Sequence, residues 1–305
     1  MKRFFILASA AIVALASCAK TEVVYKDAPE EIAFKQITNV MTKVDVEFTG
    51  DDFGVFANVY GTYADYFENE KFVDKSTCWG GNQAQYWPID GALDFAFYAP
   101  HDNTNTLVDW TYSDTEAKLE ITVDNSDLAA QVDWLYGGEL LVNKSKAAQP
   151  ETGYPIVFKH ILSKIGVTVK AESNDIVKVT SLKLKTTEQK ETATVDYSVP
   201  ATPSVTWSNT TSNEVDMTLL SAETPITTAG VVIPDFYVIP SAQQQFEIKY
   251  KVNDGPELTY TTTQLTGDWT ASTYYTYVIT VGLKEIKFAA KETDWTPSPV
   301  PGIEI

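Results

Sequence analysis

Apolar and polar residues alternate along most of the chain, the pattern of strands that bury one face and expose the other. The alternating segments are residues 53–59, 93–97, 119–123, 165–169, 246–252 and 275–283. Turn-rich stretches such as residues 253–256 separate them. Helical periodicity is nearly absent, and residues 127–133, after a Ser126 cap, form the best short helix. The pattern predicts an all-β protein of antiparallel β-sandwiches.

One interval in the middle of the chain lacks strand character. Residues 143–152 are rich in Lys, Ser, Ala, Gln and Pro, so we place a domain boundary there. The sequence therefore predicts an N-terminal β-sandwich domain over residues 31–155 and a C-terminal one over residues 156–305. The latter ends in a tail with Pro297, Pro299 and Pro301, which lack a backbone donor and cannot form an interior strand.

The first residues have the pattern of an export signal. Lys2 and Arg3 precede an apolar stretch over residues 4–16, which is shorter than the roughly 20 residues that span a membrane. The sequence Leu-Ala-Ser before Cys18 resembles the lipobox of bacterial lipoproteins. We expect residues 1–17 to be a signal peptide, Cys18 to be the lipidated N-terminus, and residues 18–30 to be a linker. The alternative is an ordinary secretory signal cut near Ala19.

Charge and cysteine content narrow the classes of protein. The chain carries a formal net charge of −18, and an acidic surface of that size repels nucleic acid, which excludes it as a partner. Once Cys18 is lipidated only Cys78 remains, so no intramolecular disulfide can form. The core must then hold the fold, and 7 Trp, 16 Tyr and 14 Phe can supply it.

Candidate chemistry is sparse. His101 and His160 stand in no recognisable catalytic setting, and a packed or edge histidine is the preferred interpretation of His160. No His or Cys pair has metal-ligand spacing, so we predict no metal site, no cofactor and no catalytic residue. A hydrolase with a scattered Ser-His-Asp triad remains the weakest alternative, because triads are defined in space.

Four aromatic residues are candidates for stacking on sugars. They are Trp110, Tyr112, Trp134 and Tyr136. Core packing is the more common fate of such residues, and it is the interpretation we prefer for each of them.

Several blocks in fixed order resemble the fimbrillin family, the type V pilins of Gram-negative anaerobes. They are IAFKQITNVMTKVDVEFTGDDFGVFANVY, YWPIDGALDFAFYAP, VFKHILSKIGVTVKA, FYVIPSAQQQFEIKY and YYTYVITVGLKEIKFAAKETDW. The resemblance implies two tandem transthyretin-like domains, lipoprotein export, display at the outer membrane and assembly into adhesive fimbriae. Its partners would be other fimbrial subunits in a head-to-tail polymer, the outer membrane through the lipid anchor, and a host or bacterial surface ligand.

The same resemblance implies assembly by donor-strand exchange. A protease removes an N-terminal strand, here residues 31–42 with Ile32, Phe34 and Ile37 as its expected buried side chains. A strand from the next subunit then fills the groove. The expected donor lies in residues 273–283 and 285–290, or in the tail, where Ile303 and Ile305 alternate.

The processing site departs from the family pattern. Many members of the family that the chain resembles carry Thr-Arg where this chain has Thr42-Lys43, and no arginine follows Arg3. Lys43 is therefore the candidate cleavage site for a protease that is not arginine-specific, or the anchor stays and the subunit sits at the base or tip. The alternative function is a surface glycan-binding lipoprotein, which would cluster aromatic residues on one outer face.

Overall fold

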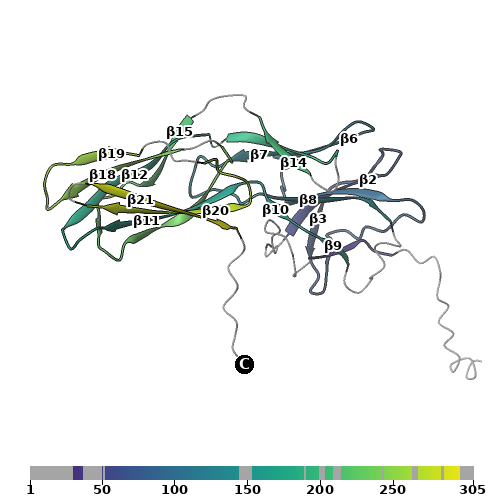
Figure 1. The fold of residues 1–305 in the computed structure, drawn as a ribbon. Helices are drawn as coiled ribbons and strands as arrows, with labels where there is room; N and C mark the ends of the chain where they lie inside the picture. The colour runs from purple at the N-terminus through teal and green to yellow at the C-terminus, as the bar shows by residue number, and fades with distance from the viewer. Residues whose placement is uncertain are drawn as a thin grey trace, which may run out of the picture.

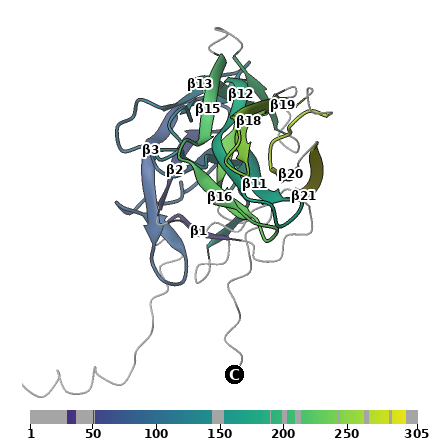
Figure 2. The same ribbon diagram turned by 90° about the vertical axis from the view of Figure 1, so that its left-hand side faces the viewer.

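The computed structural model describes residues 30–36, 50, 52–143, 153–188, 190–198, 203–208, 214–241, 244–262, 267–282 and 285–295. These residues form 21 β-strands and no helix, which confirms the all-β prediction. Figure 1 shows the strands gathered in two lobes, and Figure 2, viewed from the side of the second lobe, shows the lobes one behind the other.

The first lobe is built around an eight-stranded sheet of order β10-β8-β5-β2-β3-β4-β1-β9. Its strands are β1 (Ala33–Gln36), β2 (Asp52–Val59), β3 (Asp65–Asp74), β4 (Trp79–Gly81), β5 (Leu93–Ala99), β8 (Leu135–Val142), β9 (Tyr154–Ile156) and β10 (Lys159–His160). The terminal strands β9 and β10 are separated in the chain by residues 157–158 alone. The sheet must therefore curl until its two edges meet, and it encloses an aromatic core.

A four-stranded sheet of order β14-β13-β7-β6 covers the outer face of this curl. Its strands are β6 (Val108–Tyr112), β7 (Ala117–Asp124), β13 (Lys190–Asp196) and β14 (Ser204–Trp207). All seven residues of β5 are buried, because Phe95 and Phe97 face the inner core while Ala96 and Tyr98 face the covering sheet. The first lobe thus has two cores, one on each face of its central strands.

The second lobe is a sandwich of two further sheets around one core. One sheet has the order β17-β11-β20-β21, and the other has β15-β12-β18-β19 with β16 paired to β12. The strands are β11 (Ser163–Ala171), β12 (Val177–Glu188), β15 (Glu214–Leu220), β16 (Thr224–Ile226), β17 (Val231–Val238), β18 (Gln245–Val252), β19 (Leu258–Thr261), β20 (Thr273–Val281) and β21 (Ile286–Asp294).

A long ribbon connects the lobes near the top of Figure 1. Strand β12 pairs with β15 in the second lobe, and its continuation β13 pairs with β14 in the first. The chain thus returns from the second lobe to complete the covering sheet of the first, where β13 pairs with β7. The division into domains at residues 155 and 156 remains a prediction, and strands from both sides of that point share this sheet.

Two expectations about local structure are wrong. The sheets are not purely antiparallel, since β1 pairs with β9 in parallel and β11 pairs with β20 in parallel. Residues 127–133 form no helix. The Asp127 carboxylate accepts the backbone N–H of Ala129 at 3.0 Å, and its carbonyl accepts that of Ala130 at 3.0 Å. This closes a turn instead, because a short aspartate side chain competes with helical hydrogen bonds.

Candidate functional site

Strand β1 fills the centre of the inner core of the first lobe. The side chains of Ile32 and Phe34 are fully buried, as the sequence predicted for this strand, while Ile37 lies outside the described residues. The Phe34 ring centroid lies within 5.0 to 6.3 Å of four other phenylalanine rings. These are Phe53, Phe72, Phe95 and Phe97. Phe34 therefore lies inside the aromatic cluster, in contact with rings from β2, β3 and β5.

The backbone ladder that holds β1 is short. It pairs with β4 at two positions and with β9 at three. Next to the strand, the Ile32 N–H donates to the Gln85 carbonyl at 2.7 Å, and the Trp87 N–H donates to the Glu30 carbonyl at 2.9 Å. Phe34 in β1 and Ile32 directly before the strand are fully buried, so side-chain burial holds this segment together with its short ladder.

Strand β9, on the other side of β1, brings a tyrosine beside the core. Tyr154 stands opposite Phe34 in the ladder and is half-buried. Burial, and then the nearby Glu139 carboxylate, raise the pKa of Tyr154 to about 12. The phenol therefore stays protonated and uncharged around neutral pH.

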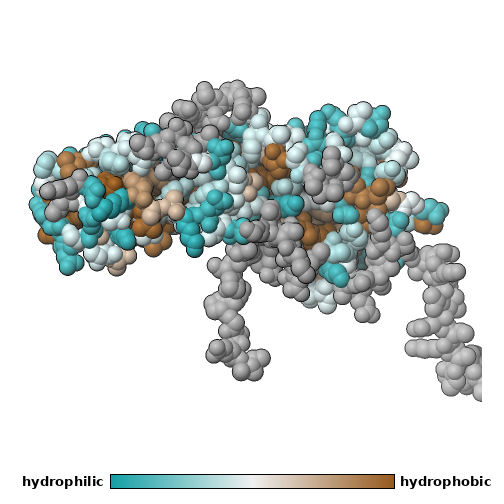
Figure 3. Space-filling view, in the orientation of Figure 1, coloured by the Kyte–Doolittle hydropathy of each residue, from teal (hydrophilic) through white to brown (hydrophobic). Residues whose placement is uncertain are grey.

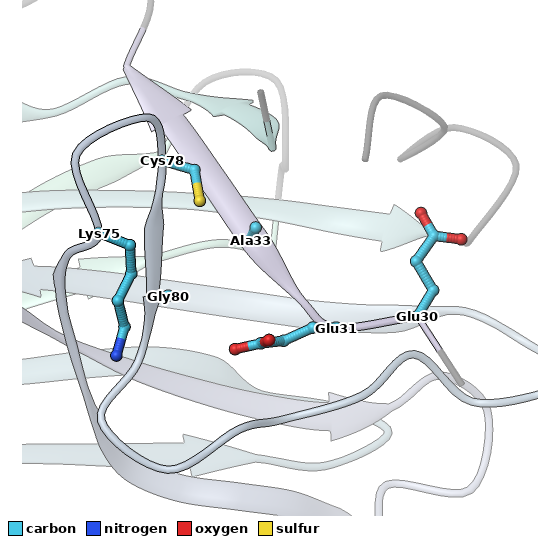
Figure 4. A pocket seen from close by; sticks show the side chains of 6 residues that line it. All are labelled: Glu30, Glu31, Ala33, Lys75, Cys78 and Gly80. Carbon is cyan, nitrogen blue, oxygen red and sulfur yellow. The ribbon is translucent and has the colours of Figure 1, made fainter. Parts of the chain in front are cut away.

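A pocket of about 390 Å³ lies along the outer side of β1. Figure 4 shows Ala33 and Glu31 on one wall, and Lys75, Cys78 and Gly80 from the β3–β4 turn and β4 on the other. Cys78 is half-buried and not in a disulfide. The pocket thus gives access from outside the lobe to the start of β1.

The last strand of the second lobe is the most exposed long strand. β21 lies at the edge of its sheet, paired with β20 alone, and none of its nine residues is buried. β20, by contrast, lies between β11 and β21. Residues 273–283, which the sequence suggested as part of the donor, therefore contain an interior strand, whereas β21 is a free edge.

Trp295, directly after β21, joins that strand to the first lobe. Its ring stacks on His160 with centroids 3.4 Å apart and on Tyr237 at 5.3 Å. It is buried within the outer core of the first lobe, although it follows a strand of the second. The His160 Nδ1 and the Asp133 Oδ1 are 2.7 Å apart, which fixes the plane of the imidazole. His160 is thus a packed histidine, as predicted.

A second contact ties the lobes together beside Trp295. The side-chain amide of Gln131 bonds the backbone of Tyr237 twice: it accepts the N–H at 2.8 Å and donates to the carbonyl at 3.0 Å. The side-chain amide thus makes the same pair of hydrogen bonds to Tyr237 that a neighbouring strand would make through its backbone. Burial, then Asp133 and Asp235, raise the pKa of Tyr237 to about 12, so the stack on Trp295 stays uncharged on this side.

The aromatic candidates for sugar stacking have different fates. Trp134 and Tyr136 are buried in the outer core. Core packing was the interpretation preferred from the sequence for all four candidates. Trp110 and Tyr112 are only half-buried, and their rings stack with centroids 5.7 Å apart. Sequence reasoning did not single out their exposed neighbour Tyr63, whose ring lies 5.7 Å from that of Tyr112. A tyrosine in a turn carries no periodic signal.

The two modification sites predicted from the sequence, Cys18 and Lys43, both lie outside the described residues. Within the described part of the chain, no group of three or more His, Cys, Asp or Glu side chains could hold a metal ion. No helix among those residues is long and apolar enough to span a membrane.

Solved structures described as fimbrial and candidate cell adhesion proteins share this fold. A fimbrial protein from Bacteroides vulgatus superimposes with a TM-score of 0.59 at 17% identity, over 88% of this chain and 100% of that one. A protein from Bacteroides uniformis described as a candidate cell adhesion protein has the same TM-score and coverage at 19% identity. The fold thus defines a class that includes fimbrial and adhesion proteins.

The chain belongs to the fimbrillin-like family, whose model matches residues 38–295. A curated relative from Bacteroides uniformis, described as a candidate fimbrium subunit, Fim1C, is 24% identical over 261 residues. That alignment covers 81% of this chain and 78% of the relative. The resemblance noted in the sequence is therefore confirmed at the level of the family.

Proposed function

We propose that the protein is a fimbrial subunit, exported as a lipoprotein through Cys18 to the outer membrane, that assembles by donor-strand exchange. In this proposal a protease cleaves after Lys43, strand β1 leaves, and a strand of the next subunit takes its place. The main support for this proposal is that Phe34 packs among four phenylalanine rings. Phe34 lies on a strand that has a short hydrogen-bond ladder and that precedes the proposed cleavage site by a few residues in the sequence.

Loss of β1 would leave an open groove whose exposure to water is unfavourable. Burying a side chain such as Ile32 or Phe34 contributes about 1.5–3 kcal/mol each, so the empty positions would expose apolar walls to water. The edges of β4 and β9 would also lose their backbone partners. An incoming strand restores both kinds of interaction, and alternate apolar side chains set its register.

The exposed edge strand β21 and the residues that follow it are the donor in this proposal. None of the residues of β21 is fully buried, although Ile286 and Phe288 pack against the core of the second lobe, so β21 can leave its sheet at a lower cost than an interior strand. Ile303 and Ile305 would supply alternate apolar side chains. Donation of a second-lobe strand of one subunit to a first-lobe groove of the next is head-to-tail, so it propagates as a filament.

Truncation tests this assembly. Protein beginning after Lys43 should form ladders that resist mild denaturant, whereas the uncleaved protein should stay monomeric. Deleting residues 286–305 from the truncated protein should abolish the ladders, provided that urea unfolding shows the shortened protein to be folded, because this deletion also removes the buried Trp295. Deleting only residues 296–305 leaves Trp295 in place and tells whether β21 or the tail is donated. Deleting β20 as well would be uninformative, because it removes an interior strand.

Truncated protein that remains monomeric would contradict a stalk role and favour a tip, an anchor or a glycan-binding subunit. The lipid anchor has its own test. A labelled fatty acid should mark the wild type and not Cys18→Ala, and equal labelling of both would disprove the anchor. N-terminal sequencing of protein from the native cell surface would identify the processing site.

A further inference from the structure

We propose that the first lobe carries a binding site for one neutral sugar unit, built on Tyr60, Tyr63 and Tyr112. The site is a pocket of about 290 Å³, at the small end of the range for ligand pockets of proteins, which begins at about 300 Å³. It is separate from the β1 groove and from Trp295, so it does not depend on the proposed assembly.

Two exposed tyrosines form one wall of this pocket. Tyr60 is 53% exposed and Tyr63 is 42% exposed, and both belong to the turn that joins β2 to β3. Tyr63 has a φ of 58°, a left-handed conformation that is uncommon for a bulky side chain. An exposed ring on a backbone position that is unfavourable for a bulky residue is a candidate for a functional role.

Tyr112, whose ring lies 5.7 Å from that of Tyr63 and continues the same aromatic surface, is held in place by its neighbours. The Tyr112 hydroxyl donates to the carboxylate of Asp94, which is buried and also accepts the backbone N–H of Leu141 at 2.6 Å. Trp110 stacks behind Tyr112, and the Trp110 indole N–H donates to the side-chain oxygen of Asn58 at 2.6 Å. These buried contacts fix the Tyr112 ring before any ligand arrives, which lowers the entropic penalty of binding.

Polar groups complete the pocket beside the rings. The β6–β7 turn supplies Ser113, Asp114, Thr115 and Glu116, and Ser198 follows β13. Hydroxyl and carboxylate groups next to aromatic faces suit a pyranose, which presents one C–H face and a rim of hydroxyls. A peptide would need a longer groove than this pocket offers.

The charges around the pocket exclude acidic sugars and disfavour cations as ligands. The pocket lining contains carboxylates and no lysine, and the chain carries a net charge of −18, so acidic sugars would be repelled. A cation is disfavoured because Asp94 already accepts two donors and Glu116 pairs with Lys118 at 2.7 Å. Asp114 remains, and its exposed charge is screened by water.

The test is saturation-transfer NMR on the purified full-length protein with methyl glycosides of glucose, galactose and N-acetylglucosamine. Methyl glucuronide and tetramethylammonium serve as charged comparisons. At least one neutral glycoside should bind, and Tyr63→Gly should weaken it by about tenfold, a loss of about 1.4 kcal/mol. Glycine removes the ring and tolerates the left-handed φ, so the melting temperature should not fall.

Tyr86→Ala is the matched control, because Tyr86 is similarly exposed, at 44%, and lies outside the pocket. It should leave binding unchanged. Three results would overturn the proposal: no neutral glycoside binds, tetramethylammonium binds in preference, or Tyr63→Gly and Tyr86→Ala have equal effects. None of these results depends on whether the protein forms filaments.

Discussion

The substitution Phe34→Ala tests whether β1 can open separately from the rest of the first lobe. Phe34 is fully buried among four rings, and truncating such a side chain costs about 3–5 kcal/mol. If β1 opens alone, this whole amount is subtracted from the free energy of its local opening. Since about 1.4 kcal/mol is a factor of ten, the open population should rise by roughly two to three and a half powers of ten.

Amide hydrogen exchange measures that population. The reporters are the N–H groups of Ile32 and Trp87, which bond the carbonyls of Gln85 and Glu30 across the β1 segment. Both should exchange faster in Phe34→Ala by the factor just given. Amides of the interior strand β5 should respond much less, because their ladders with β2 and β8 do not involve β1.

The matched control is Phe246→Ala. Phe246 is also fully buried, but it belongs to the core of the second lobe. Its loss should accelerate exchange there and leave Ile32 unaffected. If Phe34→Ala instead accelerates β5 and β1 equally, then β1 opens only with the whole lobe. Our account of a separately removable strand would then be wrong.

Two further predictions concern stability. Trp295→Ala should lower the free energy of unfolding in urea by about 3–5 kcal/mol and speed amide exchange in β21, because it removes the ring that stacks on His160. A loss below about 1 kcal/mol would contradict the view that Trp295 holds the end of β21 against the first lobe. Burial acts to raise the pKa of Asp102, but hydrogen bonds from the Thr104 hydroxyl and from nearby backbone N–H groups outweigh it and hold the pKa at about 2. Because this folded-state pKa is below the usual 3.8, Asp102 should contribute about 2 kcal/mol of stability above about pH 4, lost as the pH falls towards 2. Asp102→Asn should flatten that part of the pH profile of unfolding free energy, and an unchanged profile would refute the assignment.

The positions of many strands follow from the sequence alone. Residues 119–123 alternate apolar and polar side chains, and in β7 the odd positions are buried while the even ones are not. The burial of Ile32 and Phe34 was expected from the family resemblance, and their two-residue spacing agrees with it. Alternation is a local property, since neighbouring residues of any strand point to opposite faces.

Which strands pair with each other, and how deeply each strand is buried, were decided by the tertiary structure. β5 is buried on both faces because the β13–β14 segment returns from the second lobe to cover it. β11 and β20 pair in parallel although more than 90 residues separate them. The alternating pattern of each strand is equally compatible with a parallel or an antiparallel partner.

The candidate sites show the same division. The sequence pointed to the β1 strand and to Trp110 and Tyr112, because apolar spacing and residue type are visible there. The sequence did not reveal that the Trp295 ring stacks on His160, nor that the rings of Tyr63 and Tyr112 are in contact. Both join segments that are distant in the chain, and such contacts exist only once the intervening sheets have formed, because the sheets set the distance between the segments.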